Sequence, residues 1–165
     1  MLTFELIETS SLRIWDFGWF DASAFRALGQ HDDEPLAILR DFIASPIFPR
    51  SFIEIPNPWG ASLDRHGPVL VGSLFASAYR FISHEQLRVA TEKILSNTDF
   101  RPELSSAQRR AVDAWLADVR ASSVFRLNRR ACSEVAWHGS WLLFEEFIAV
   151  ELDSSTVRVA VFGFD

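Results

Sequence analysis

Cysteine is almost missing from this chain of 165 residues, which contains only Cys132. No disulfide can form within the chain, so the composition fits a reducing compartment. A lone cysteine is more often a small core residue than a nucleophile. We therefore expect Cys132 to do no chemistry, although Arg129 and Arg130 nearby would favour its thiolate if all three were exposed.

Targeting and membrane signals are missing as well. The first ten residues, MLTFELIETS, contain no basic stretch followed by an apolar one, so we expect no signal peptide. The longest apolar stretch, PVLVGSLFASA at 68–78, is too short to span a bilayer. These absences predict a cytoplasmic protein with no membrane partner.

Positive charge is in deficit. The chain has sixteen Lys and Arg and twenty-two Asp and Glu, for a net charge of −6. Nucleic-acid binding needs clustered positive charge, so we expect no nucleic-acid partner. Bases exceed acids at 101–130, where there are seven bases and three acids. Either the acidic remainder of the chain neutralises this segment, or that remainder presents an acidic face to a basic partner. The same two alternatives, the chain's own acids or a bound anion, apply to Arg120, Arg126, Arg129 and Arg130.

The motifs of common enzyme classes are absent. VGSLF and HGSWL lack the flanking glycines of a nucleophile elbow, and no phosphate-binding or dinucleotide-binding glycine loop occurs. The four histidines are far apart in the sequence, so we expect no metal and no cofactor. Asp64, Arg65 and His66 adjoin in a proline-rich loop, as either a general acid–base group or a solvated turn. We assign no catalytic residue.

The chain is rich in apolar and aromatic residues. It is 48% hydrophobic and contains fifteen Phe and six Trp. No repeat, linker or low-complexity segment interrupts it, so we predict one globular domain over residues 1–165. Alternating residues predict a strand at 2–8. The segment FDASAFRALG at 20–29 predicts a short helix, with Asp21 as the N-cap and Gly29 just past the end.

A second helix is predicted to begin at Asp32 or Asp33, because Pro35 and an apolar stripe follow. Five prolines within 45–68 then allow only a short strand, at 51–55, and an irregular loop. Residues 69–82 fit either a buried strand or a buried helix, and their small residues favour helix beyond Gly72.

Two further helices have clear start signals, because Ser83 and Ser105 each begin a capping-box pattern. From Val135 onward the hydrophobic period changes to two, which predicts antiparallel strands. The predicted fold is α+β, with the helices packed on one face of an antiparallel sheet that ends in a C-terminal hairpin.

Glu146 is the unusual residue of this hairpin. Pairing Leu152 with Val157 and Glu151 with Arg158 puts apolar residues opposite apolar residues on both faces of the hairpin, and opposite charges face each other. The same pairing puts Glu146 on the apolar face opposite Gly163. A carboxylate is costly there unless it is paired. Three alternatives remain open. A β-bulge turns Glu145 and Glu146 outward, the strand has reached the sheet rim, or Glu146 is a functional carboxylate with Arg or His partners.

These features favour a binding protein over an enzyme. We expect a cytoplasmic inhibitor of the immunity type, which neutralises a basic toxin domain by occlusion through an acidic, aromatic-bearing surface. The alternative is a small enzyme or ligand-binding domain that uses Glu146. The residues expected at the partner surface are Asp32, Asp33, Glu34, Trp59, Glu145 and Glu151.

Overall fold

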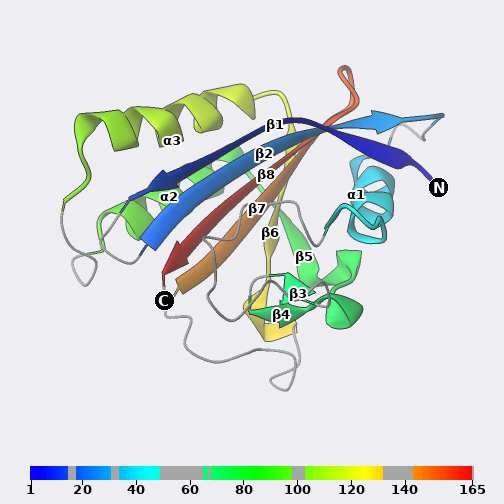
Figure 1. Cartoon of the computed structure of the whole chain (residues 1–165), viewed down its shortest axis with the longest axis horizontal. Helices are drawn as coiled ribbons and strands as arrows, with labels where there is room; N and C mark the ends of the chain where they lie inside the picture. Colours follow the sequence, from blue (N-terminus) through cyan, green and yellow to red (C-terminus); the bar gives the residue numbers. More distant parts are fainter. Residues whose placement is uncertain are drawn as a thin grey trace.

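A six-stranded antiparallel sheet forms the centre of the fold (Figure 1). A computed structural model describes residues 1–14, 18–30, 34–48, 65–66, 68–97, 103–131 and 143–164. The strand order is β1-β2-β8-β7-β6-β5, so the hairpin of β7 and β8 occupies the middle of the sheet. In chain order the strands are β1 (Thr3–Arg13), β2 (Gly18–Leu28), β5 (Tyr79–Ile82), β6 (Ser123–Leu127), β7 (Leu143–Glu151) and β8 (Thr156–Phe164).

Three helices and a small two-stranded ladder accompany the sheet, which gives the α+β class that the sequence predicts. The helices are α1 (Pro35–Ile43), α2 (His84–Leu95) and α3 (Ser106–Asp118). The ladder pairs β3 (Arg65–His66) with β4 (Val69–Leu70). The 3-10 turns are η2 (Val71–Ser73), η3 (Ala76–Ala78) and η4 (Arg129–Ala131).

The helices cover both faces of the sheet, so the prediction that they share one face is wrong. α1 packs against the face that carries Ile148 and Val159, whereas α2 and α3 pack against the face that carries Phe147 and Phe162. Figure 1 shows α3 above the sheet and α1 below it. The reason is visible in β7 and β8. Successive strand residues point to opposite faces, and these strands are apolar at both, so each face needs its own cover.

The predicted helix at 20–29 is wrong, because these residues form most of β2. Their apolar side chains alternate between the two layers, with Phe20 in the α2–α3 layer and Phe25 in the α1 layer. Asp21 is therefore a buried strand residue and caps no helix. Gly29 does end the element, at a φ of +109° that suits glycine.

The other helices agree better with the sequence. Ser83 and Ser105 cap α2 and α3, and each makes both bonds of a capping box. α1 follows Glu34, whose side chain makes no cap bond; Asp32 and Asp33 lie outside the described residues. Beyond Gly72 the favoured helix is wrong, because the chain forms short 3-10 turns and then β5. The predicted strand at 51–55 and Cys132 lie outside the described residues.

The predicted hairpin forms, but its register differs by two residues. Glu151 pairs with Thr156 rather than Arg158, because the turn begins one residue earlier and ends with Ser155 at a φ of +50°. A shift of two keeps every side chain on its predicted face. Arg158 lies opposite Ala149 and forms its ion pair with Glu8 of β1 instead, at 3.3 Å between Nη1 and Oε1.

Gly163 lies opposite Phe144 and Trp19, not opposite Glu146. A Cβ at this position would lie 2.4 Å from Cζ2 of the Trp19 ring. Glycine is therefore required here because the indole packs directly against the backbone of β8, and not because a ligand must reach Glu146.

Gly163→Ala should lower the free energy of unfolding by about 1–3 kcal/mol, because a buried ring or the strand must move to accept the methyl group. Gly72→Ala is the matched control, since a Cβ there would meet no heavy atom within 4 Å. Urea unfolding of the two variants measures the difference. Equal stability of both variants would contradict this packing.

Candidate functional site

Glu146 is fully buried on the α1 face of β7. It lies opposite Val161 of β8, and the pairing of β7 with β8 is continuous from Leu143 to Glu151. Neither a β-bulge at Glu145 and Glu146 nor an exposed sheet rim explains this carboxylate. The bulge and rim alternatives of the sequence analysis are therefore wrong.

Two side chains from distant parts of the chain hydrogen-bond to Glu146. His66 of β3 lies with Nε2 at 2.7 Å from Oε2, and Tyr79 of β5 donates its hydroxyl to Oε1 at 3.0 Å. The imidazole also stacks on Phe48, with ring centroids 4.1 Å apart and an angle of 19° between the planes. Each carboxylate oxygen thus has a donor, as a buried carboxylate requires.

The sequence singles out His66 but not Tyr79. His66 belongs to the acid–base candidate at 64–66, of which Asp64 and the side chain of Arg65 lie outside the described residues. Tyr79 was missed, although it is the only tyrosine of the chain. A buried phenol needs a hydrogen-bond partner, so its presence in an apolar segment was the available signal.

Glu146, His66 and Tyr79 together contain the residue types of general acid–base chemistry. Their exposed fractions are 0%, 0% and 6%, so this structure gives a substrate no access to the reactive atoms. Four clefts with walls of described residues are not lined by any of these three side chains. The arrangement is best explained as the polar centre of the α1 layer.

Asp21 is a second buried carboxylate on the same face. Val161 separates the two, because it pairs with Glu146 on one side and with Asp21 on the other. Neither oxygen of Asp21 has a hydrogen-bond partner of normal geometry. Burial raises the pKa of Asp21 from 3.8 to about 7, and the hydroxyl of its cross-strand neighbour Ser11 opposes that rise.

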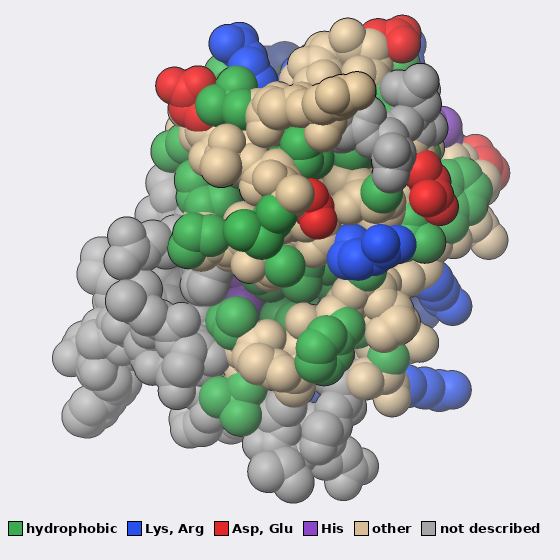
Figure 2. Space-filling model, turned by 90° about the vertical axis from the view of Figure 1, so that its right-hand side faces the viewer, with side chains coloured by type: hydrophobic (Ala, Val, Ile, Leu, Met, Phe, Trp, Pro, Cys, Tyr) green, Lys and Arg blue, Asp and Glu red, His purple; other side chains and the backbone are tan. Residues whose placement is uncertain are grey.

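Of the six residues expected at an acidic partner surface, the structure describes Glu34, Glu145 and Glu151. Glu34 is exposed at the start of α1, and Glu151 accepts a bond from Ser154 beside the hairpin turn. Glu145 is six residues from Glu151 on β7, a separation of about 20 Å along a strand. Asp32, Asp33 and Trp59 lie outside the described residues. On the face drawn in Figure 2, the acidic side chains are scattered among other types rather than gathered in one patch.

The basic segment forms a cleft of about 270 Å³, beside the ends of β5 and β6. Arg80 and Arg126 lie directly opposite each other across these strands, and Arg126 pairs with Glu145 at 2.9 Å. Of the two sequence-based alternatives, pairing with the chain's own acids thus holds for Arg126. The arginines that line this cleft are Arg80, Arg126, Arg129 and Arg130.

The two edges of the sheet differ strongly. β5 has four residues, whereas β1 has eleven, of which nine are exposed. Leu6 and Ile7 of β1 are each 47% exposed, and Ile7 has no partner on β2 because a bulge interrupts the pairing there. Among the described residues no strand pairs with the outer side of β1, which is therefore a long, open strand edge with apolar side chains in solvent.

Comparisons with models of known protein families, with curated proteins and with solved structures find no match to this chain. Among the described residues, no helix is both long and apolar enough to cross a membrane. The same residues contain no group of three or more His, Cys, Asp or Glu side chains arranged to hold a metal ion. Any functional assignment therefore depends on the geometry of the chain itself.

The titration of Asp21 predicts a pH dependence of stability. Between about pH 4 and pH 7 the unfolded chain loses this proton while the folded chain keeps it, so the free energy of unfolding should fall as pH rises and then level off. The difference between the folded and unfolded pKa values of Asp21 corresponds to a fall of at most roughly 4 kcal/mol in the free energy of unfolding. Asp21→Asn should remove this fall and stabilise the protein at about pH 8 by roughly 2 kcal/mol. Urea unfolding at several pH values measures it, and parallel curves for both proteins would contradict it.

The bonds to Glu146 predict a graded loss of stability. Glu146→Ala leaves His66 and Tyr79 without their acceptor, so the free energy of unfolding should fall by about 3–5 kcal/mol. Glu146→Gln keeps the shape and the acceptor for Tyr79, and should cost about 1–2 kcal/mol. Urea unfolding compares the two, and equal losses would mean that these hydrogen bonds contribute little.

Proposed function

We propose that this chain is a protein-binding domain that pairs with a strand of its partner along β1. In this proposal it acts in the cytoplasm as an inhibitor of the immunity type, occluding a basic toxin domain. The single observation that supports the proposal is the open edge of β1, which offers backbone donors and acceptors over eleven residues.

β1 lacks most of the devices that protect natural sheet edges. It contains no proline and no lysine, it is not short, and no described element pairs with its outer side. Its one irregularity is the bulge at Ile7, and both Leu6 and Ile7 are exposed. Exposed apolar residues on an unpaired edge favour addition of a strand from another chain.

The charge of the chain supports a basic partner. The net charge is −6, and the exposed acids of β1 are Glu5 and Glu8, with Arg13 at the far end. Acids beside the docking edge would speed the encounter with a basic protein and would do so less at high salt. This surface differs from the one expected from the sequence, since it uses the acids of β1 rather than those of β7.

Ile7→Lys should weaken partner capture at least about tenfold, because it removes an apolar contact and adds a charge at the edge. Val89→Lys is the matched control, since Val89 is a 53% exposed apolar residue on α2. The assay is co-expression with the product of the neighbouring gene, followed by pulldown and binding kinetics at two salt concentrations.

The proposal is supported if Ile7→Lys loses capture of the partner while Val89→Lys keeps it. Equal capture by both variants overturns it. A wild-type homodimer that Ile7→Lys disrupts would also overturn the inhibitor assignment, because the added strand would then come from a second copy of this chain. Sedimentation of the purified protein measures that outcome.

A further inference from the structure

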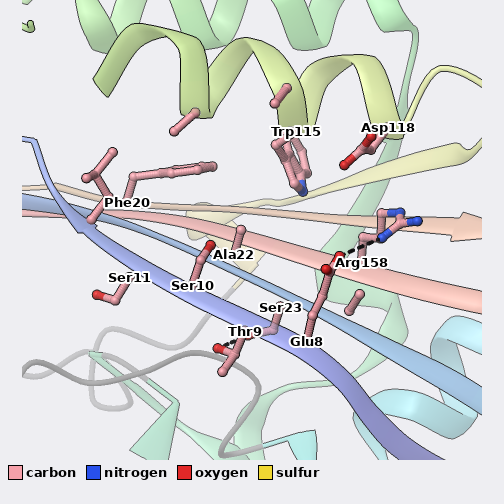
Figure 3. A pocket seen from close by; sticks show the side chains of 14 residues that line it. Glu8, Thr9, Ser10, Ser11, Phe20, Ala22, Ser23, Trp115, Asp118 and Arg158 are labelled. Carbon is pink, nitrogen blue, oxygen red and sulfur yellow. Dashed lines mark hydrogen bonds and ion pairs between the residues drawn. The ribbon is translucent and has the colours of Figure 1, made fainter. Parts of the chain in front are cut away.

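A cleft of about 360 Å³ lies between α3 and the strands beneath it (Figure 3). Side chains of β1, β2 and β8 form its floor, and Ala111, Ala114 and Trp115 of α3 form its roof. This volume is in the range of small-ligand sites. The walls are mainly apolar, and their ring contact is between Phe20 and Trp115, with centroids 6.4 Å apart.

The cleft exists because several residues on its two walls have small side chains. Ala22 and Ala24 face the cleft from β2, and Ala111 and Ala114 are exposed alanines on the opposite wall. Small residues alone do not make a binding site, since they can equally reflect loose packing at a sheet edge. The polar groups of the cleft provide the independent evidence.

Two buried N–H donors of the cleft have no acceptor. Trp115 is 6% exposed, and its Nε1 atom has no hydrogen-bond partner. In Figure 3 the indole nitrogen points from α3 toward the floor of the cleft. Nε of Arg158 is likewise buried without a partner. An unsatisfied buried donor costs about 1–3 kcal/mol, so a bound acceptor would remove a cost that the empty protein carries.

The charged groups of the cleft have both signs. Nη1 of Arg158 forms the ion pair with Glu8. Nε and the side of the guanidinium group next to it are therefore available to bind a carboxylate. Asp118 makes no ion pair with a described residue, and it ends α3, where the helix dipole disfavours an acid. Figure 3 shows Asp118 above Arg158 at the same end of the cleft.

These groups select among ligand classes. The cleft contains one cation and two acids, so a simple anion meets net repulsion, and a simple cation leaves both N–H donors unsatisfied. A neutral acceptor satisfies the donors but neither acid. A zwitterion satisfies all of them, with its carboxylate at the N–H donors and its ammonium group beside Glu8 and Asp118.

We propose that this cleft binds a free α-amino acid with an apolar side chain. The side chain occupies the space between Phe20, Trp115 and the alanines, and the two charged groups lie at the Arg158 end. This site goes beyond the proposed protein-binding function, because it requires no partner strand on β1. Binding of the amino acid and capture of a protein partner can therefore fail independently.

The direct test observes the indole N–H of Trp115 by ¹⁵N-edited NMR of the full chain. The six tryptophans each give one indole signal, and Trp115→Phe identifies the signal that belongs to Trp115. The probes are L-phenylalanine and L-leucine, together with phenylpropionate and phenethylamine, which each lack one of the two charged groups. We expect a saturable downfield shift of the Trp115 signal, with at least about tenfold weaker binding of both single-charge analogues.

A pair of variants on α3 locates the site. Ala114→Leu fills the cleft with a good helix former and should abolish the shift, whereas Ala117→Leu changes an exposed alanine of α3 that does not line the cleft. Arg158→Lys keeps the charge but removes the Nε donor, so it should weaken binding at least about tenfold.

Three results would overturn the proposal. The first is no shift of the Trp115 signal with either amino acid up to about 10 mM. The second is equal binding of phenylpropionate or phenethylamine, which would mean that only the apolar part is recognised. The third is full binding by Ala114→Leu, which would place the amino acid elsewhere. Circular dichroism of each variant confirms that it is folded.

Discussion

Burial of both faces of the central hairpin is the constraint on which the rest of this structure depends. β7 and β8 lie in the middle of the sheet and are apolar on both sides, so the chain must supply two covering layers. α1 and the short turns form one layer, and α2 with α3 form the other. Each buried large apolar side chain contributes about 1.5–3 kcal/mol, so neither layer could be omitted.

This two-layer arrangement puts carboxylates where water does not reach them. Glu146 is accommodated because His66 and Tyr79 are brought to it by β3 and β5. Asp21, two strands away on the same face, has no comparable donor and is the less favourable of the two. The α1 layer therefore contains one carboxylate with two hydrogen-bond donors and one without a donor of normal geometry, and its stability depends on both.

The opposite layer is incomplete at the β1 edge. α3 packs on the sheet through Trp115, which contacts Phe20 of β2. Alanines next to this contact leave a cleft, and most residues of β1 remain exposed. An unpaired edge and an unfilled cleft each lower stability, so their presence on the same side favours a functional explanation. Glu146, which the sequence pattern singles out, instead lies in the interior.

Local patterns determined much of the fold. The capping boxes at Ser83 and Ser105 predicted α2 and α3 correctly, because a cap satisfies backbone donors within the same four residues. Alternation predicted the hairpin and the faces of its side chains, including the apolar face of Glu146. The register differed by two residues because the turn lies one residue earlier in the chain, and alternation does not report where a turn begins.

Tertiary contacts decided the remainder. The segment at 20–29 has residues compatible with a helix, but pairing with both β1 and β8 makes it a strand, since tertiary burial outweighs small differences in propensity. The sequence alone determined that Glu146 would be costly to bury. Only the fold decided what compensates it, because His66 and Tyr79 are 80 and 67 residues away along the chain. Contacts at such separations depend on how whole layers pack, and no local pattern encodes them.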